Sequence, residues 1–234
     1  HASSLTQTLI AATLIQIVAT ASVLALTAIA PTVAKDLDIG AYWIGYQISL
    51  IYFSGMFSSA IAGTLVQRFG PIRIEQAALA CFVLGFIGIA SAEIPLIIAA
   101  SLFIGIGYGL NNPASSEMLS RVTPFNRRNI VFSLKQSGVP LGGILASFAF
   151  PFLTRFFDWH VALLIGAVAP ILTMVLLAAT HAAEPVNPAP RRSFLKGFAE
   201  EQSTIWRNLR LRALSALGFA YSAMQLSVSA FAVV

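Results

Sequence analysis

The sequence predicts an all-α membrane protein, with a bundle of six transmembrane helices followed by one further helix. Two observations support this fold class. Hydrophobic residues make up 57% of the 234 residues and charged residues only 10%, whereas a soluble domain carries about 25% charged residues. The apolar residues also gather into long runs, and the mean hydropathy is +0.82. A chain this poor in charge cannot cover its surface with polar groups, so we expect the lipid bilayer to surround it.

Each apolar run has about the 20 residues that a helix needs to cross the hydrocarbon core. Helices are expected because lipid cannot satisfy free backbone amides. The runs are also continuous, whereas the strands of a membrane barrel alternate between polar and apolar residues. The runs cover residues 8–30, 42–66, 74–91, 95–118, 130–153, 160–179 and 211–234.

The gap between the sixth and seventh runs is the longest, and its prolines indicate a linker. We therefore predict a six-helix domain over residues 1–183 and a cytoplasmic linker over 184–210. Residues 211–234 would be the first helix of a second, truncated bundle. Within the linker, residues 193–208 are either a helix on the membrane surface or a solvated loop.

Lysine and arginine are distributed unevenly between the gaps. Eleven of these 14 residues lie after the second, fourth and sixth runs, and only Lys35 and Arg155 lie after the first, third and fifth. The positive-inside rule then places the amino terminus in the cytoplasm. The net charge of +5 is explained by this topology, so we expect no nucleic-acid partner.

The sequence offers no catalytic or metal-binding constellation. Cys81 is the single cysteine, and His1, His160 and His181 are far apart. No His, Cys and carboxylate spacing suits a metal ion or a nucleophile. We expect no metal, no cofactor and no enzymatic activity.

The gap between the second and third runs carries glycines and basic residues at fixed spacings. The residues concerned are Gly63, Gln67, Arg68, Gly70 and Arg73. This segment resembles the signature loop of the major facilitator superfamily, in which an aspartate stands at the position of Gln67. The resemblance implies a gating role, because in the family that carboxylate helps latch the two halves together. An uncharged Gln67 implies a weaker latch.

The fifth run carries a second motif of glycines and proline: Gly138, Pro140, Gly142 and Gly143. It resembles the fifth-helix motif of the same family, in the form found in cyanate-permease-like members, and this implies a conformational role. Gly138 and Gly142 are four residues apart, so they lie on one helix face and allow close approach of another helix. Pro140 frees a backbone carbonyl and is expected to bend the helix.

Lys135 is the most informative candidate for substrate binding. It lies about 10 Å along its helix, at 1.5 Å per residue from the helix start. A lysine at such a depth faces a cavity or a partner, or it extends to the headgroups. The acidic residues in or next to the other runs, Glu75, Glu93 and Glu117, lie near helix ends. Because we expect none of them to neutralise Lys135, we predict that it faces the central cavity and binds a small anion.

Other polar residues within the runs are further candidates for the substrate path. They either line the cavity or join helices by hydrogen bonds. In the family the first and fourth helices line this path, and the family's proton antiporters have an arginine where this chain has Ser101. The candidates beside Lys135 are Gln136, Asn112, Asn111, Gln16 and Tyr108.

Taken with the family resemblance, these observations imply a secondary active transporter. A six-helix domain of inverted 3+3 repeats and the carboxy-terminal half of the same transporter would hold a small-molecule substrate, an organic or inorganic anion, and move it by alternating access. The alternatives are a multidrug or metabolite efflux exchanger of the same family, and a seven-helix receptor or channel. We expect a multi-pass protein of the inner (plasma) membrane of a bacterium.

The predicted topology can be tested by labelling single cysteines in intact cells, with Cys81 replaced by alanine. A membrane-impermeant thiol reagent should modify a cysteine at Asp158, outside the cell, and should not modify one at Ser193. Labelling of the cysteine at Ser193 but not of the one at Asp158 would show that the topology is the reverse of the predicted one.

Overall fold

The chain forms helices and no strands over residues 4–40, 42–180 and 203–231, which are the residues that this computed structural model describes. It divides into two compact units, His1–Pro188 and Ala189–Val234. Most of the predicted linker, including more than half of the segment predicted as a surface helix or a loop, lies outside the described residues.

Six stretches of the first unit are long and apolar enough to cross a membrane, and they correspond to the first six predicted runs. The all-α membrane fold class is therefore confirmed. The helices are α1 (Leu5–Ala28), α2 (Ala30–Asp36), α3 (Tyr42–Phe69), α4 (Pro71–Ala90), α5 (Ile94–Val122), η1 (Phe125–Arg127), α6 (Arg128–Gln136), α7 (Gly138–Leu153), α8 (Trp159–Gly166) and α9 (Val168–Thr180). The seventh run forms α11 (Leu209–Phe231) in the second unit.

Two of the six spans are interrupted at the place where proline removes a backbone hydrogen bond. Proline has no N–H to donate to the carbonyl four residues earlier. For Pro140 that carbonyl belongs to Gln136, the last residue of α6. For Pro170 it belongs to Gly166, the last residue of α8. The predicted distortion at Pro140 is confirmed as a break between α6 and α7.

The predicted close approach at the fifth-helix motif occurs between α7 and α1. A Cβ atom added to Gly138 would lie 2.9 Å from both Gln16 Cβ and the Thr13 carbonyl oxygen. At Gly142 it would lie 2.5 Å from the Ile17 carbonyl oxygen. Any side chain larger than hydrogen would therefore push the two helices apart.

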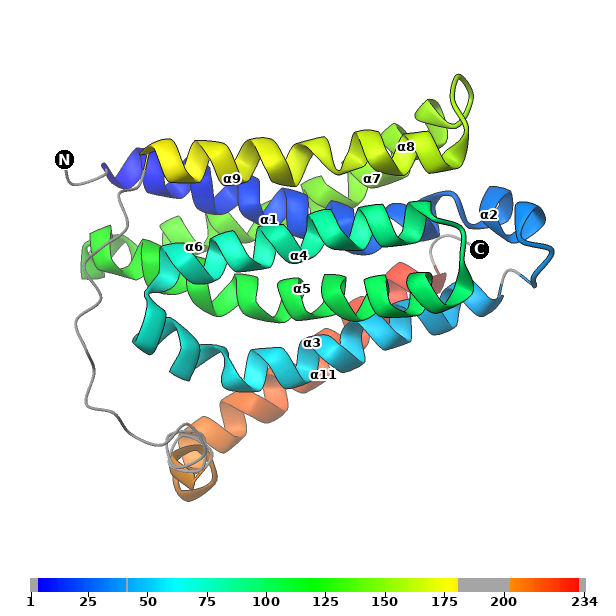
Figure 1. The fold of residues 1–234 in the computed structure, drawn as a ribbon. Helices are drawn as coiled ribbons and strands as arrows, with labels where there is room; N and C mark the ends of the chain where they lie inside the picture. The colour runs from blue at the N-terminus through cyan, green and yellow to red at the C-terminus, as the bar shows by residue number, and fades with distance from the viewer. Residues whose placement is uncertain (1–3, 41, 181–202, 232–234) are drawn as a thin grey trace. The chain divides into compact units, whose positions relative to one another are not determined.

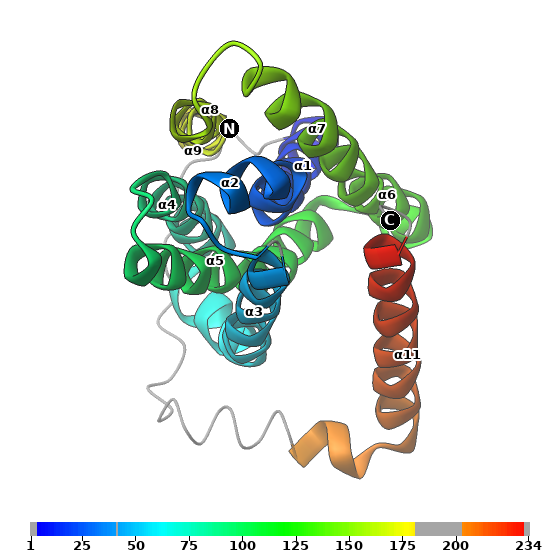
Figure 2. The same ribbon diagram turned by 90° about the vertical axis from the view of Figure 1, so that its right-hand side faces the viewer.

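Helix α5 packs against its neighbours by the same means. A Cβ atom added to Gly55 of α3 would lie 3.2 Å from the Gly105 carbonyl oxygen of α5. Ser54 and Ser58 of α3 donate hydrogen bonds to the α5 carbonyls of Leu102 and Gly105. On its other side α5 meets α4. Both views show α5 between α3 and α4 (Figures 1 and 2). This packing fixes the positions of the polar side chains that α5 carries.

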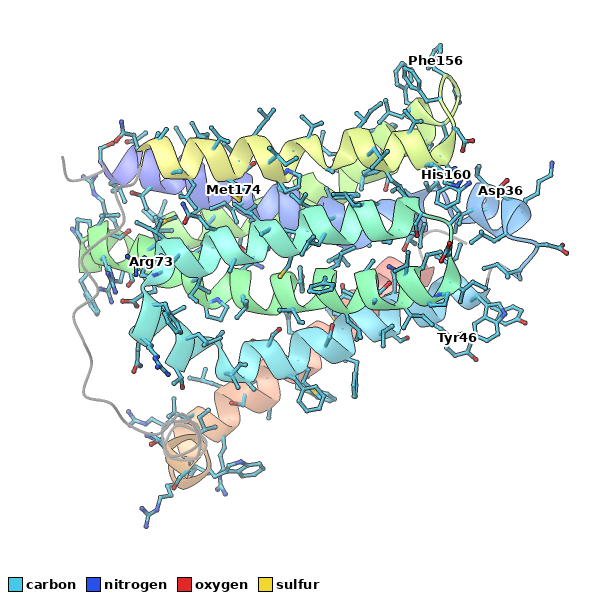
Figure 3. The ribbon with its side chains drawn as sticks, in the orientation of Figure 1. Asp36, Tyr46, Arg73, Phe156, His160 and Met174 are labelled. Atoms are coloured by element: carbon cyan, nitrogen blue, oxygen red, sulfur yellow. The ribbon has the colours of Figure 1, made fainter. Side chains whose placement is uncertain are left out.

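The loops of the first unit gather at opposite ends of the bundle. Arg73 lies at the end where α1 begins, whereas Asp36, Tyr46 and His160 lie at the other end (Figure 3). At the first end Gly70 turns the chain into α4 with a φ of 85°, a conformation that favours glycine. This alternation of loops agrees with six spans that cross in succession.

The adjacent glycines of α7 provide a matched test of the α1–α7 contact. Both Gly142→Ala and Gly143→Ala gain the same helix propensity, about 1 kcal/mol. At Gly143 the added methyl meets only Leu24 Cδ1 at 3.6 Å, whereas at Gly142 it clashes with backbone. We therefore expect Gly142→Ala to be less stable than Gly143→Ala by about 1–3 kcal/mol, measured by unfolding in detergent. Equal stabilities would contradict the close approach.

Candidate functional site

The Lys135 ammonium lies inside the bundle, between α6 and α5. Lys135 is 1% exposed. Its Nζ donates hydrogen bonds to Asn112 Oδ1 at 2.8 Å and to Ser116 Oγ at 2.9 Å. It also contacts the Asn112 carbonyl oxygen at 3.4 Å. The side chain does not extend to the headgroups, and α5 supplies all three acceptors.

Asn112 covers the Lys135 ammonium from the surface side. The Asn112 residue is exposed and Ser116 is half-buried. Of the groups that accept from Lys135, the Asn112 amide is therefore the one that a solute could reach and displace. Gln136, the neighbour of Lys135, is also exposed.

The expectation that no carboxylate of this half neutralises Lys135 overlooked Glu75. It lies in the second turn of α4 and is 0% exposed. Neither carboxylate oxygen has a hydrogen-bond partner among the described residues. The Ser115 hydroxyl, on α5, donates to the Asn111 carbonyl at 2.8 Å. The charge that acts on Glu75 is that of Lys135.

Helical periodicity could have identified Glu75 as buried. Ala78, Leu79, Phe82 and Phe86 lie 3, 4, 7 and 11 residues after it, so they share its helix face, and all four are buried. Its nearness to the helix start suggested an interfacial position, but the face that it occupies decides its burial.

Gln16 and Asn111 join α1 to α5 inside the bundle. Asn111 Nδ2 donates to Gln16 Oε1 at 3.4 Å, and the two residues are 0% and 3% exposed. The Asn111 Oδ1 atom has no hydrogen-bond partner in the described part of the chain. This pair joins helices, and a contact with substrate stays a prediction.

Tyr108 of α5 is half-buried and lies one turn before Asn112. Its ring meets the ring of Tyr52 from α3 edge-on, with centroids 5.8 Å apart. Residues four apart share a helix face, so Tyr108, Asn112 and Ser116 form one row along α5. The amide and the hydroxyl of this row accept hydrogen bonds from the Lys135 ammonium, and the aromatic ring belongs to the residue one turn before Asn112.

The signature-loop residues lie at the opposite end of α3 from Tyr42. Gln67, Arg68 and Arg73 are exposed, and the Arg68 guanidinium lies 5.2 Å from the centre of the Phe69 ring. Neither Arg68 nor Arg73 makes an ion pair with another described residue. Gly63 is half-buried. Their gating role remains a prediction.

The described residues include no group of three His, Cys, Asp or Glu side chains placed to hold a metal ion. Outside the spans, His160 Nδ1 lies 2.7 Å from Asp158 Oδ1, and this contact lowers the pKa of the Asp158 carboxyl. The polar groups of the site are amides, hydroxyls, the Lys135 ammonium and the Glu75 carboxyl, and the amides, hydroxyls and ammonium suit the binding of a polar or charged solute.

The family follows from a comparison of the whole sequence with protein-family models. The model of the Major Facilitator Superfamily matches residues 12–234. The chain belongs to the Major Facilitator Superfamily. This superfamily is one of transporters, so the expectation that the chain is not an enzyme is confirmed, and the alternative of a seven-helix receptor or channel does not fit the family. The cyanate-permease-like form of the fifth-helix motif stays a resemblance.

Curated relatives of this superfamily chain include transporters named for 4-hydroxybenzoate and for niacin. It is 28% identical over 152 residues to the 4-hydroxybenzoate transporter PcaK of Pseudomonas aeruginosa, covering 64% of this chain and 34% of that protein. It is 25% identical over 147 residues to the niacin transporter NiaP of Acinetobacter baylyi, covering 62% of this chain and 34% of that protein. The chain thus spans about a third of the length of these relatives.

Solved structures of superfamily members share the fold. The inward-open xylose transporter XylE from E. coli matches with a TM-score of 0.66 and 16% identity, over 93% of this chain and 56% of that one. A peptide transporter POT in complex with sulfate matches with a TM-score of 0.62 and 20% identity, over 95% of this chain and 46% of that one. The superfamily chain therefore covers roughly the amino-terminal half of this fold.

The burial of Lys135 predicts low chemical reactivity of its amine. Lys35 is exposed and serves as the internal reference. Because hydrogen bonds to charged groups contribute about 1.5–3 kcal/mol, Lys135 should be acetylated at least about tenfold more slowly than Lys35. Asn112→Ala removes one acceptor and should narrow that gap. Mass spectrometry of labelled peptides measures both rates, and equal rates in the unaltered protein would refute the placement.

Proposed function

We propose that the complete transporter moves small organic anions and that Lys135 supplies the charge that attracts them. The observation that carries this proposal is the burial of one basic side chain behind an exposed amide. Every other lysine and arginine in the described part of the chain is exposed. Burying a charged group is costly unless it is paired, so a functional role explains why a lysine occupies this position.

The geometry indicates how a carboxylate would reach Lys135. A substrate carboxylate would replace Asn112 Oδ1 as the acceptor from Nζ, which stands 2.8 Å away. The exchange is favourable because a hydrogen bond between two charged groups is stronger than one to a neutral amide. The displaced Asn112 amide and the exposed Gln136 could then donate to the same carboxylate.

Two features favour an aromatic acid. The relatives include transporters named for 4-hydroxybenzoate and niacin, each a ring that bears a carboxylate. Tyr108 lies one turn from Asn112 on α5, and aromatic rings attract one another through offset or edge-on contacts. Gln16 and Asn111 are almost fully buried, so they would donate hydrogen bonds to ring substituents only in a conformation of the transporter that uncovers them.

Alternating access supplies the rest of the proposed mechanism. A second six-helix half, joined through the segment after residue 183, would close the substrate site from the other side. Gly63, Gln67, Arg68, Gly70 and Arg73 would latch the halves, with the amino terminus in the cytoplasm of a bacterium. Uptake and efflux would use the same site, so the efflux exchanger differs only in direction.

Pairs of acids and their neutral amides test the proposal. In the full-length protein, nicotinate should bind at least about tenfold more tightly than nicotinamide, which corresponds to 1.4 kcal/mol. The same preference is expected for 4-hydroxybenzoate over 4-hydroxybenzamide. Isothermal titration in lipid nanodiscs measures these affinities.

Lys135→Gln keeps the length and polarity of the side chain and removes the charge. Its acid-to-amide affinity ratio should fall to near one, while Lys35→Gln, which makes the same change at an exposed lysine, should keep the ratio. If Lys135→Gln preserved the preference, or if neither acid bound, the anion proposal would be wrong.

A further inference from the structure

Glu75 is the one buried acidic side chain among the described residues, and nothing assigned so far to the transporter uses it. Both oxygens lack hydrogen bonds, and the residue is fully buried. A carboxylate so placed is costly as an ion unless a positive charge stands close by. Its ionisation therefore depends on the state of its neighbours.

Among the described residues, Lys135 of α6 is the charged side chain that acts on Glu75, and the charged groups on the helices packed against α4 are paired or exposed. Helices α1, α3, α5, α8 and α9 pack against α4. Over their described lengths, α1 and α9 contain no charged residue. On α5, Glu117 and Arg121 form an ion pair with each other at 2.9 Å.

The remaining charges on these elements lie at the bundle ends. Arg68, on α3, is exposed, and His160, at the start of α8, contacts Asp158. Arg73, on α4 itself, is exposed at the end of the bundle (Figure 3). Tyr52 on α3 and Tyr108 on α5 are the tyrosines that face the interior, where each ring contacts the other.

Lys135 thus interacts with one group that can carry a negative charge, the Glu75 carboxylate, and with one neutral acceptor, the Asn112 amide. On the inner side stands Glu75, which no solute can reach because it is 0% exposed. On the outer side stands the exposed Asn112 amide, which a solute can displace. One ammonium cannot fully compensate two carboxylates at once. An anion that binds Lys135 from outside therefore leaves the inner carboxylate with an uncompensated charge.

We propose that Glu75 is a proton-binding residue of the transporter, taking up one proton from solution each time an anion binds Lys135. This inference rests on the proposed function and adds its coupling ion. With the anion bound, Glu75 is neutral, Lys135 is positive and the anion is negative. When the anion leaves, the proton leaves too, and Glu75 and Lys135 neutralise each other again.

The proton count does not depend on where the shared proton sits in the empty site. An ionised pair and a pair of neutral acid and neutral amine hold the same number of protons. The complex holds one more than either, so an anion and a proton are bound together. By linkage, anion affinity must then fall as pH rises, by about tenfold per pH unit at full coupling.

Calorimetry of nicotinate binding in buffers of different ionisation enthalpy measures this proton directly. The full-length protein should take up about one proton per nicotinate between about pH 6 and 8, where free carboxylic acids are ionised. Glu75→Gln should bind nicotinate with no proton uptake and with an affinity that no longer changes with pH. Glu117→Gln, which alters a glutamate outside the pair, should keep the uptake.

The outcomes separate the two proposals. Failure of both acids to bind would overturn the anion function, and the coupling with it. Nicotinate binding without proton uptake would leave the function standing and overturn the role of Glu75, as would uptake that persists in Glu75→Gln. If Glu75→Gln does not fold, infrared difference spectra of the unaltered protein decide between the outcomes. Binding of nicotinate must then produce the absorption band of a protonated carboxyl group. The band must shift in frequency when the protein is made with ¹³C-glutamate, and it must persist in Glu117→Gln. The absence of that band would overturn the inference.

Discussion

The close approach of helix backbones at glycine is the constraint on which the rest of the bundle depends. Lipid is as apolar as leucine, so helices in a membrane gain little by hiding apolar surface from each other and associate through packing and interhelical hydrogen bonds. Gly138 and Gly142 bring α7 onto α1, and Gly55, Gly105 and Gly109 bring α3 onto α5. At these distances Ser54 and Ser58 reach backbone carbonyls of the facing helix.

The same contacts place the polar side chains. Gly138 packs on the Cβ of Gln16, and this holds the Gln16 amide where Asn111 can donate to it. Because α5 is fixed between α3 and α4, its row of Asn112 and Ser116 stands at a set distance from Lys135. The candidate site is therefore positioned by backbone packing rather than by the polar groups themselves.

This division explains which features were predictable from the sequence. The six spans, the break before Pro140 and the glycine face of α7 follow from local rules of length, missing donors and helical period. The placement of Lys135 and the charge partner of Lys135 depend on which faces of α4, α5 and α6 meet. Glu75 was missed for that reason, since distance from a helix end says little about a residue whose whole face is covered.

The break between α6 and α7 gives this arrangement a mechanical consequence. Lys135 lies two residues before Ser137, the residue at which the helix is interrupted. After the break, Gly138 and Gly142 fix α7 against α1, while before it the ammonium bonds to α5. A change in backbone angles at Ser137 would alter the position of Lys135 relative to Asn112 and Glu75 without separating α7 from α1. Since a charge in a low-dielectric interior is sensitive to the distance of its partner, the position of α6 sets how strongly Lys135 interacts with Asn112 and with Glu75.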